Sequence, residues 1–227
     1  MTSMQTKRLV VFDAYGTLFD VHAAAAIHAD RVGPDFARMS ASWRQKQLEY
    51  SWTRSLMRRH ADFWTCTQEA LDWAMALYGI SPANGLRGDL LAAYRNLRPY
   101  DDAGPMLDSL RAAGFGLAIL SNGTHDMLRD AVTAAGWNDL FAAILSIDDA
   151  GIFKPDPRVY TLVETATGVD PASTVFVSGN PWDSAGAASA GFRVVRLARA
   201  SAPPEYMFAS RMAEIASLAK LPALLGC

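Results

Sequence analysis

Four segments of the chain have the apolar pattern of buried strands, and each ends in polar residues. These segments cover residues 8–16 (RLVVFDAYG), 115–124 (FGLAILSNGT), 173–183 (STVFVSGNPWD) and 192–199 (FRVVRLAR). Their Val, Ile, Leu and Phe residues follow one another without alternating with polar ones. This pattern is typical of parallel strands that are covered on both faces.

Segments with helical spacing separate these predicted strands. They occupy residues 103–115, 125–137 and 157–169. Gly114 and Gly136 stand near the ends of the first two segments, where a helix C-cap is expected. Strands that alternate with helices through short connections predict an α/β fold, with a doubly wound, Rossmann-like parallel sheet as its core.

Residues 20–100 depart from this alternation, because they contain no run that resembles a strand. The segment is dense in helix formers and aromatic residues, and residues 40–64 predict one long helix. We expect an all-helical cap over residues 20–100, inserted after the first strand. The α/β core would then consist of residues 1–19 and 101–227.

Composition and charge narrow the possible functions. The 227 residues are 51% hydrophobic and 19% charged, which suits a globular protein with a large core. The net charge of −2 makes a nucleic-acid partner unexpected. No apolar run reaches the roughly 20 residues of a membrane span, and residues 1–13 do not read as a signal peptide. Cys66 and Cys227 are too few for a disulfide framework. We therefore expect a cytoplasmic protein with no membrane partner.

Polar side chains follow three of the predicted strands. Asp13 ends the first run, Ser121 and Asn122 end the second, and Ser178, Asn180 and Asp183 follow the third. The stretch GIFKPDPRVY adds Lys154 and Tyr160, which we place in a loop before the next helix. Ligands of parallel α/β sheets bind beyond the carboxyl ends of the strands. Four segments would therefore deliver polar groups to the same edge.

Taken singly, each of these residues also has a structural interpretation. Asp13 can cap a turn, and Ser121 or Asn122 can cap a helix. Asp183 can be an ordinary first-turn carboxylate, and Lys154 a solvated loop lysine. In the helical region, Arg44 can form a surface ion pair, while Tyr15, Phe63 and Trp182 can be core aromatics. The joint pattern, and no single residue, favours a functional site.

Five motifs in consistent order carry a specific resemblance. They are FDAYGTLFD (12–20), WRQKQLEYSW (43–52), LAILSNG (117–123), KPDPRVY (154–160) and SGNPWD (178–183). Together they resemble the L-2-haloacid dehalogenases of the haloacid dehalogenase superfamily. The likeness runs from about residue 8 to residue 197, and residues 212–225 fit more loosely. The first motif alone marks only the superfamily, in which magnesium-dependent phosphatases predominate.

Two departures from the phosphatase pattern set the dehalogenase interpretation apart. The phosphatases carry Asp-x-Asp at the first strand, whereas this chain has Tyr15 at the second position. They also hold Mg²⁺ with acidic residues after a later strand, where this chain has Asn180 and retains Asp183. A hard cation would lack carboxylate ligands here, and phosphoryl transfer would lose its main charge stabiliser. We expect no metal and no other cofactor.

The resemblance implies a reaction in two steps. Asp13 would displace halide from carbon and form an ester, with Arg44 and Asn122 stabilising the departing halide. Asp183, oriented by Lys154, Asn180 and Ser178, would then activate the water that hydrolyses the ester. An L-2-haloacid would give a D-2-hydroxy acid, because displacement from the back side inverts the carbon.

The resemblance also assigns the remaining site residues. Thr17, Tyr160 and Ser178 complete the catalytic set. Ser121 and the backbone N–H groups of Ala14 and Tyr15 would hold the substrate carboxylate. The pocket walls would be Leu48, Phe63 and Trp182. The implied partner is a small 2-halocarboxylate, and a homodimer is expected.

Three other functions stay open at this point. A phosphatase of the same superfamily would need Mg²⁺. A second type of hydrolase would open another carbon–heteroatom bond next to a carboxylate, for example in a strained cyclic amino acid. A non-enzymatic α/β binding module would have no need to keep Asp13, Lys154 and Asp183 together. Pro181 is a local departure within SGNPWD, and it either tightens or shifts the loop that carries Asn180.

Overall fold

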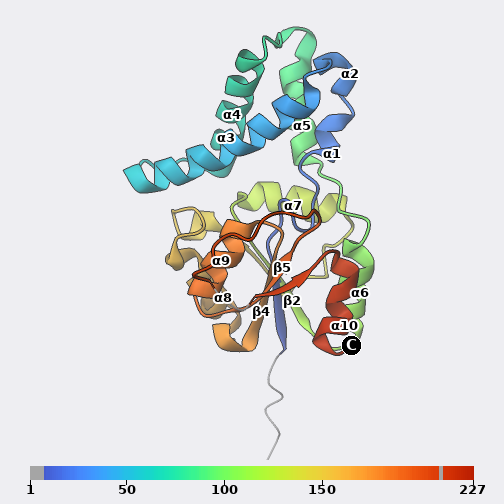
Figure 1. Cartoon of the computed structure of the whole chain (residues 1–227), viewed down its shortest axis with the longest axis vertical. Helices are drawn as coiled ribbons and strands as arrows, with labels where there is room; N and C mark the ends of the chain where they lie inside the picture. The colour runs from blue at the N-terminus through green and yellow to red at the C-terminus, as the bar shows by residue number, and fades with distance from the viewer. Residues whose placement is uncertain (1–7, 210–211) are drawn as a thin grey trace, which may run out of the picture.

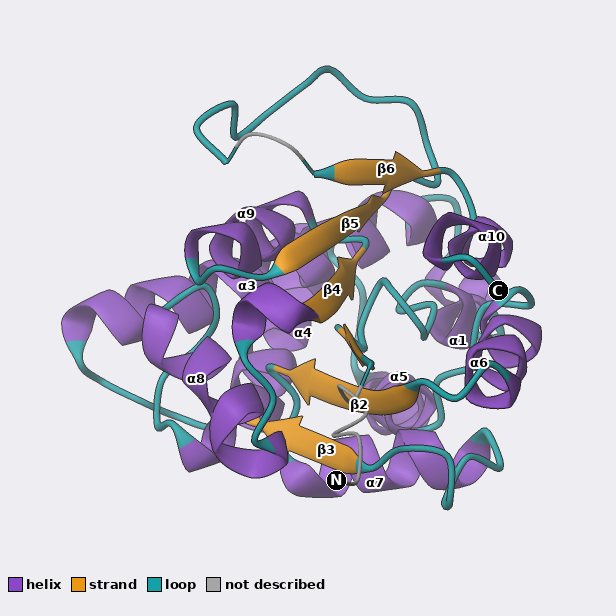
Figure 2. Ribbon diagram, turned by 90° about the horizontal axis from the view of Figure 1, so that it is seen from below, coloured by secondary structure: helices purple, strands orange, loops and turns teal. Residues whose placement is uncertain are grey.

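The computed structural model describes residues 8–209 and 212–227, and its centre is a parallel sheet. The strand order is β3-β2-β1-β4-β5-β6, and every neighbouring pair is parallel. Figure 2 views this sheet from below, with helices on both of its sides. The strands are β1 (Leu9–Phe12), β2 (Gly116–Ser121), β3 (Ala143–Ser146), β4 (Thr174–Ser178), β5 (Arg193–Leu197) and β6 (Ala213–Ile215). This order confirms the predicted doubly wound α/β fold.

The four strands expected from the apolar runs are present as β1, β2, β4 and β5. Two others, β3 and β6, were not predicted. Both lie at the edges of the sheet, where one side of a strand has no neighbour. β3 was overlooked, although this strand lies within the apolar run of residues 140–147 (LFAAILSI). β6 has only three residues, two of them exposed, which is too short for a recognisable pattern.

The helices of the core cover both faces of the sheet. In Figure 2, α8 and α9 lie on one side of the strands, and α6 and α10 lie on the other. The predicted C-cap glycines are confirmed, because Gly114 (φ 84°) and Gly136 (φ 72°) follow α6 and α7 in the left-handed region. The core helices are α6 (Ala103–Ala112), α7 (His125–Ala134), α8 (Pro157–Thr167), α9 (Pro181–Ser189) and α10 (Leu221–Leu225). Short 3₁₀ turns occur at Ala83–Gly85, Ile147–Asp149, Pro171–Ser173 and Leu218–Lys220.

Five helices separate β1 from α6 and lie above the sheet in Figure 1. They are α1 (Ala23–Ala26), α2 (Ala29–Val32), α3 (Phe36–Met57), α4 (Phe63–Leu77) and α5 (Leu86–Arg95). The prediction of one helix over residues 40–64 is wrong. The chain turns at Arg58, which has a left-handed φ of 54°, and Asp62 then caps α4 by accepting a hydrogen bond from the Thr65 N–H. This turn directs Phe63 back toward the core, where it packs on Phe153.

The chain enters and leaves the helical region at adjacent points. The Asp20 N–H donates to the Arg98 carbonyl (3.0 Å), and the Tyr100 N–H donates to the Leu18 carbonyl (2.9 Å). A bridge between Phe19 and Pro99 lies between these two bonds. The division into a core of residues 1–19 and 101–227 and a cap of residues 20–100 stays a prediction, and the paired crossing supports it.

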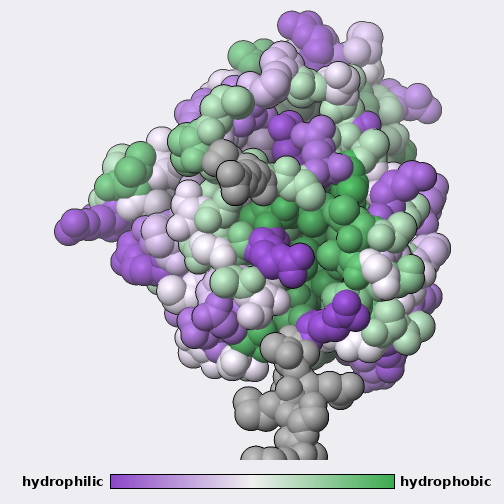
Figure 3. Space-filling view, turned by 60° about the horizontal axis from the view of Figure 1, so that its bottom comes forward, coloured by the Kyte–Doolittle hydropathy of each residue, from purple (hydrophilic) through white to green (hydrophobic). Residues whose placement is uncertain are grey.

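The two ends of the parallel sheet differ in what surrounds them. The carboxyl ends of the strands face the helices α1 to α5 (Figure 1), so polar groups at those ends are covered. The opposite end is seen in Figure 3, where hydrophobic residues gather near the start of the described chain and hydrophilic residues border them. Within residues 8–209 and 212–227, no helix combines the length and the hydropathy needed to cross a bilayer.

Candidate active site

Asp13 lies directly beyond β1, at the switch point where the sheet order changes direction between β1 and β4. Its backbone N–H continues the ladder by donating to the Val177 carbonyl (3.0 Å). The carboxyl group is buried, and its Oδ2 accepts hydrogen bonds from Thr17 Oγ1 (2.8 Å) and Asn180 Nδ2 (2.8 Å). Both of these partners are hydrogen-bond donors, so together they fix the orientation of the Asp13 carboxyl group.

Lys154 places a buried positive charge between two carboxylates. Its Nζ donates to Asp13 Oδ1 (3.1 Å), Asp183 Oδ2 (3.0 Å) and the Leu120 carbonyl (2.7 Å). The side chain has no solvent exposure. A buried ammonium is stable only when its donors are all used, and here each of the three has an acceptor. Lys154 is therefore no solvated loop residue.

Asp183 lies in the first turn of α9 and is completely buried. Burial raises the pKa of this carboxyl group to about 6, although the Lys154 ammonium acts in the opposite direction. Tyr160 donates its hydroxyl to Asp183 Oδ1 (2.7 Å). Burial and the Asp183 charge in turn raise the pKa of the Tyr160 phenol well above its ordinary value. The phenol thus remains a hydrogen-bond donor.

Two expectations about this part of the site need correction. Tyr160 is in helix α8 and not in the preceding loop, since the helix begins at Pro157. Asp183 is oriented by Lys154 and Tyr160, whereas the side chain of Asn180 bonds to Asp13 and to the Tyr15 carbonyl (2.9 Å). The Asn180 amide therefore orients the carboxylate of Asp13 and not that of Asp183.

Hydrogen bonds between backbone N–H groups and side-chain hydroxyls hold the loop after β4 in place. The Ser178 hydroxyl accepts from the Asn180 N–H (3.1 Å), and Thr17 Oγ1 accepts from the Gly179 N–H (2.8 Å). Pro181 occupies the first turn of α9, where its fixed φ is favourable and no N–H is required. Pro181 therefore begins the helix and leaves the Asn180 side chain directed at Asp13.

Several buried donors near Asp13 have no acceptor among residues 8–209 and 212–227. The backbone N–H groups of Ala14 and Tyr15 donate to none of these residues, although both residues are buried. Asn122 accepts from the Lys154 N–H through Oδ1 (3.0 Å), which leaves its buried Nδ2 without a partner. Ser121 Oγ accepts from the Gly123 N–H (3.1 Å), so its own proton is available. Buried donors in native structures are normally satisfied, and these groups are suited to an anionic ligand.

The helical region contributes Arg44, Leu48 and Phe63. Arg44 Nη2 donates to the Tyr15 carbonyl (3.3 Å), so the guanidinium reaches the loop after β1 without touching Asp13. Phe63 is buried and packs on the ring of Tyr15, with centroids 6.1 Å apart. Leu48 is partly buried on α3, one turn beyond Arg44. We use the term cap side for these residues and the others that reach the site from the helices α1 to α5.

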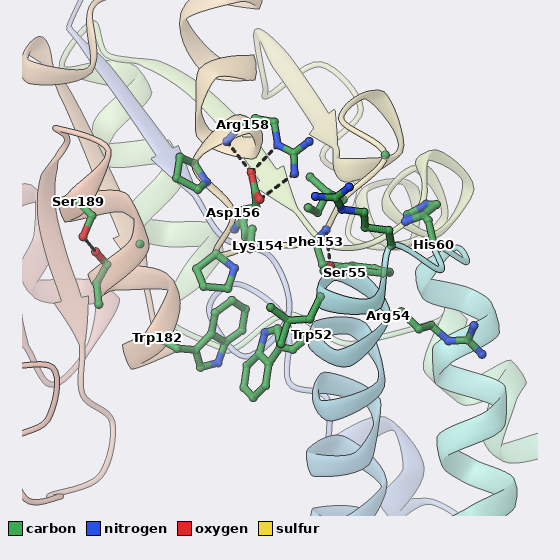
Figure 4. Close-up of a pocket in the computed structure, with 18 of the residues that line it drawn as sticks. Trp52, Arg54, Ser55, His60, Phe153, Lys154, Asp156, Arg158, Trp182 and Ser189 are labelled. Atoms are coloured by element: carbon green, nitrogen blue, oxygen red, sulfur yellow. Dashed lines mark hydrogen bonds and ion pairs between the residues drawn. The ribbon is translucent and has the colours of Figure 1, made fainter.

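Trp182 lies at the border between the site and a larger pocket of about 910 Å³. Its ring meets Trp52 of α3 edge-on, with centroids 5.4 Å apart, as the two facing rings in Figure 4 show. Lys154 and Trp182 are among the residues that line this pocket, and Asp13 is not. The pocket therefore adjoins the carboxylate cluster and does not contain it.

Sequence reasoning missed three polar residues of the cap side: Gln47, Thr67 and Tyr94. Gln47 is completely buried and accepts from Arg44 Nη1 (2.7 Å). It also donates to Thr67 Oγ1 (2.6 Å) and Tyr94 (3.0 Å). The one available signal was the position of Gln47, three residues after Arg44 and so on the same face of a helix.

Comparisons with known proteins agree with this arrangement. Residues 7–191 match the family of haloacid dehalogenase-like hydrolases. The chain is 47% identical to (S)-2-haloacid dehalogenase 4A of Burkholderia cepacia over 96% of this chain and 95% of that one.

Solved structures give the same result. The crystal structure of a dehalogenase has a TM-score of 0.95 and 46% identity, covering 99% of both chains. The L-2-haloacid dehalogenase of Xanthobacter autotrophicus with chloropropionic acid covalently bound has a TM-score of 0.88 and 40% identity, covering 96% of this chain and 98% of that one. This chain therefore belongs to the haloacid dehalogenase-like hydrolases and, among them, to the (S)-2-haloacid dehalogenases, which are hydrolases acting on carbon–halide bonds.

Proposed function

We propose that the protein converts short-chain L-2-haloacids to D-2-hydroxy acids and halide through an ester on Asp13, without a metal. One observation carries the proposal. A buried carboxylate at the end of β1 lies next to buried donors without acceptors among the described residues, namely the N–H groups of Ala14 and Tyr15 and the Asn122 amide. An anionic substrate would satisfy these donors and present its carbon to Asp13.

In the first step, Asp13 attacks carbon 2 of the haloacid. A bond forms between a carboxylate oxygen and that carbon, and the carbon–halogen bond breaks with its electron pair leaving on the halide. Thr17 and Asn180 hold Oδ2 from one side (2.8 Å each), which fixes the direction of the carboxylate. Ser121 and the N–H groups of Ala14 and Tyr15 bind the substrate carboxylate.

The departing halide needs positive charge and hydrogen-bond donors. Asn122 offers a buried amide, and Arg44 offers a cation on the cap side. At 4 Å and an effective dielectric constant near 20, two unit charges interact by about 4 kcal/mol. Leu48, Phe63 and Trp182 exclude water from this step. Because attack and departure are on opposite sides of the carbon, the configuration inverts.

In the second step, water hydrolyses the ester. Asp183 accepts a proton from the water, whose oxygen bonds to the carboxyl carbon of Asp13. The ester then breaks between that carbon and the alkoxide oxygen, the alkoxide takes the proton back from Asp183, and the hydroxy acid leaves while Asp13 and Asp183 return to carboxylates. A carboxyl group with a pKa of about 6 is a stronger base than an exposed aspartate and is still ionised at neutral pH. Lys154 and Tyr160 orient it, and Ser178 shapes the loop beside it.

The charge arrangement supports metal-free chemistry. The ammonium of Lys154 lies within 3.1 Å of Asp13 and 3.0 Å of Asp183, so a protein cation already bridges the two carboxylates. Neutral residues, Tyr15 and Asn180, stand at the two positions where the phosphatase pattern has acids. We expect halide release from L-2-chloropropionate to continue in excess EDTA. A Mg²⁺-dependent phosphatase activity in its place would contradict the proposal.

A single turnover in ¹⁸O-labelled water tests the ester. With enzyme in excess, the label should enter Asp13 and not the hydroxy acid, because water attacks the carboxyl carbon. Mass spectrometry of the peptide that contains Asp13 measures the label. Direct entry of ¹⁸O into the first-turnover product would show that water attacks the substrate carbon and would overturn the mechanism.

We also propose a homodimer formed around the pocket beside Trp182. The C-terminal end of α3 projects beyond the other cap helices in Figure 1, and Leu56 (84%) and Met57 (61%) are exposed there. Leu56 lines the pocket together with Phe208, which is 75% exposed. Since a two-fold contact uses the same patch on both copies, each helix end would enter the pocket of the other. Light scattering of wild type and Leu56→Asp tests this, and a monomeric wild type would refute it.

A further inference from the structure

Arg44 is a cation without a carboxylate partner in the described part of the chain. Other arginines of the same helical region pair with acids, as Arg54 does with Glu69 and Arg87 with Asp72. Arg44 donates to two neutral oxygens, Gln47 Oε1 (2.7 Å) and the Tyr15 carbonyl (3.3 Å), and forms no ion pair within residues 8–209 and 212–227. Its charge is thus held in place without being neutralised.

The chemistry of its neighbours fixes which way the Gln47 amide points. Thr67 donates its hydroxyl proton to the Phe63 carbonyl (2.7 Å), so Thr67 Oγ1 acts as an acceptor toward Gln47. The group that approaches it at 2.6 Å must therefore be the NH₂ of Gln47. The amide oxygen then faces the opposite way, toward Arg44, and an inverted amide would set NH₂ against guanidinium.

Tyr94 connects this amide to the loop after Asp13. Its hydroxyl lies 3.0 Å from Gln47 Nε2, and its ring stacks on Tyr15 with centroids 5.8 Å apart and an interplanar angle of 13°. The Tyr15 carbonyl is the other acceptor for Arg44. Arg44 and Gln47 on α3, Thr67 on α4 and Tyr94 on α5 thus form one network. Burying a primary amide is costly unless its groups are bonded, and Gln47 meets this condition with partners on all three helices.

We infer that Gln47 is a positioning residue that aims the Arg44 guanidinium at the departing halide. The inference rests on the proposed function, in which Arg44 receives that halide. Gln47 acts through geometry, because its oxygen fixes one edge of the guanidinium. It also acts by being neutral: a carboxylate at the same place would form an ion pair with Arg44 and weaken its attraction for a halide.

Two nearly isosteric variants separate these contributions. Gln47→Met keeps the volume and removes the hydrogen bonds. Gln47→Glu keeps an acceptor toward Arg44 and adds a negative charge. Ser51→Ala is the matched control: Ser51 is buried one turn further along α3, and its hydroxyl bonds to the Leu48 carbonyl (2.7 Å) without contacting Arg44.

The rate of halide release in a single turnover, with L-2-chloropropionate and L-2-bromopropionate, is the first measurement. We expect Gln47→Met to slow release by about 10- to 100-fold, since small misplacements of a reacting group have effects of this size. The loss should be greater for chloride, which is the poorer leaving group and depends more on a well-placed donor. Gln47→Glu should also lower bromide affinity in calorimetric titrations without substrate. Ser51→Ala should change neither the chloride-to-bromide ratio nor the affinity.

A purely structural role would give a different result. If Gln47→Met slows both substrates equally, or if Gln47→Glu binds bromide as wild type does, the inference is wrong. Urea unfolding of each variant confirms that the folded protein is compared. Failure of the proposed function looks different again: wild type would release no halide from either acid, whereas the bromide titrations would still test the Gln47–Arg44 pair.

Discussion

The two sides of the site are built in different ways. On the core side, Asp13, Lys154 and Asp183 are buried and joined through one ammonium, within 3.1 Å of each carboxylate. On the cap side, Arg44 is partly buried and bonds to the Tyr15 carbonyl (3.3 Å) in the loop after β1. The core side therefore carries the covalent chemistry that we propose. The cap side supplies a cation whose position depends on the packing of α3, α4 and α5 against one another.

The largest expected effect comes from removing the nucleophile. Asp13→Ala should lower turnover by at least about 10⁴-fold, because loss of a covalent nucleophile removes the first step altogether. Halide release from L-2-chloropropionate measures the change. Arg44→Lys keeps a charge on the cap side but loses the planar fork, so it should retain measurable activity with a lower kcat, because Arg44 acts on the departing halide.

The opposite order of effects would contradict the distinction between the core side and the cap side of the site. If Asp13→Ala retained turnover while Arg44→Lys abolished it, the cap and not the core would contain the essential group. Mass spectrometry adds an independent criterion, since Arg44→Lys should still form an ester on Asp13.

The next effect concerns the buried ammonium. Lys154→Met should destabilise the fold by about 3–5 kcal/mol, because Asp13 and Asp183 would remain buried without a counter-charge. Urea unfolding measures the loss. The matched control is Arg158→Met, which breaks an exposed pair with Asp156 and should cost at most about 1 kcal/mol. Equal losses of stability for the two variants would show that burial does not decide how much an ion pair contributes to the free energy of unfolding.

A smaller effect follows from the pKa of Asp183, which burial raises to about 6. A general base must be ionised, so the second step should slow about tenfold for each pH unit below 6. The first step needs no proton transfer from water. The ester on Asp13 should therefore accumulate at pH 5 and decay at pH 8, as followed by mass spectrometry after rapid quenching. An ester that decays equally fast at both values would exclude Asp183 as the base.

The same contrast between core and cap explains what could be predicted from the sequence. Asp13, Asn122 and Asn180 follow apolar runs, and parallel strands bring their carboxyl ends to one edge, so their proximity follows from local pattern. Lys154 lies outside any strand, but its motif and order along the chain were sufficient to include it. Both edge strands were missed: β6 because its three residues form no pattern, and β3 although it lies in the apolar run of residues 140–147, because only four residues of that run pair with the sheet.

The helices α1 to α5 were harder to predict because their contacts are tertiary. The turn at Arg58 depends on where Phe63 must pack, and helix spacing alone continues through it. Gln47 has the polarity of a solvated residue, although it is completely buried. Its burial depends on Thr67 and Tyr94, which are 20 and 47 residues away in the chain. Only the packing of three helices brings these partners together.

The smallest expected effect distinguishes a tyrosine of the core from a tyrosine of the cap. The Tyr160 hydroxyl donates to Asp183 (2.7 Å) and so stabilises its ionised form. Tyr160→Phe removes this bond, which should raise the pKa of Asp183 and move the acid limb of the kcat profile upward by about one unit.

Tyr94→Phe also deletes a buried hydroxyl, but that hydroxyl bonds to Gln47 and not to Asp183. The acid limb should therefore stay where it is, while the ratio of chloride to bromide release rates changes. If both variants moved the acid limb of the kcat profile equally, the cap side as well as the core side would influence the pKa of Asp183. If neither variant moved it, the hydrogen bond from Tyr160 would have no effect on the pKa of Asp183. A shift confined to Tyr160→Phe would assign ester hydrolysis to the core side, because the hydroxyl that contacts Asp183 belongs to that side.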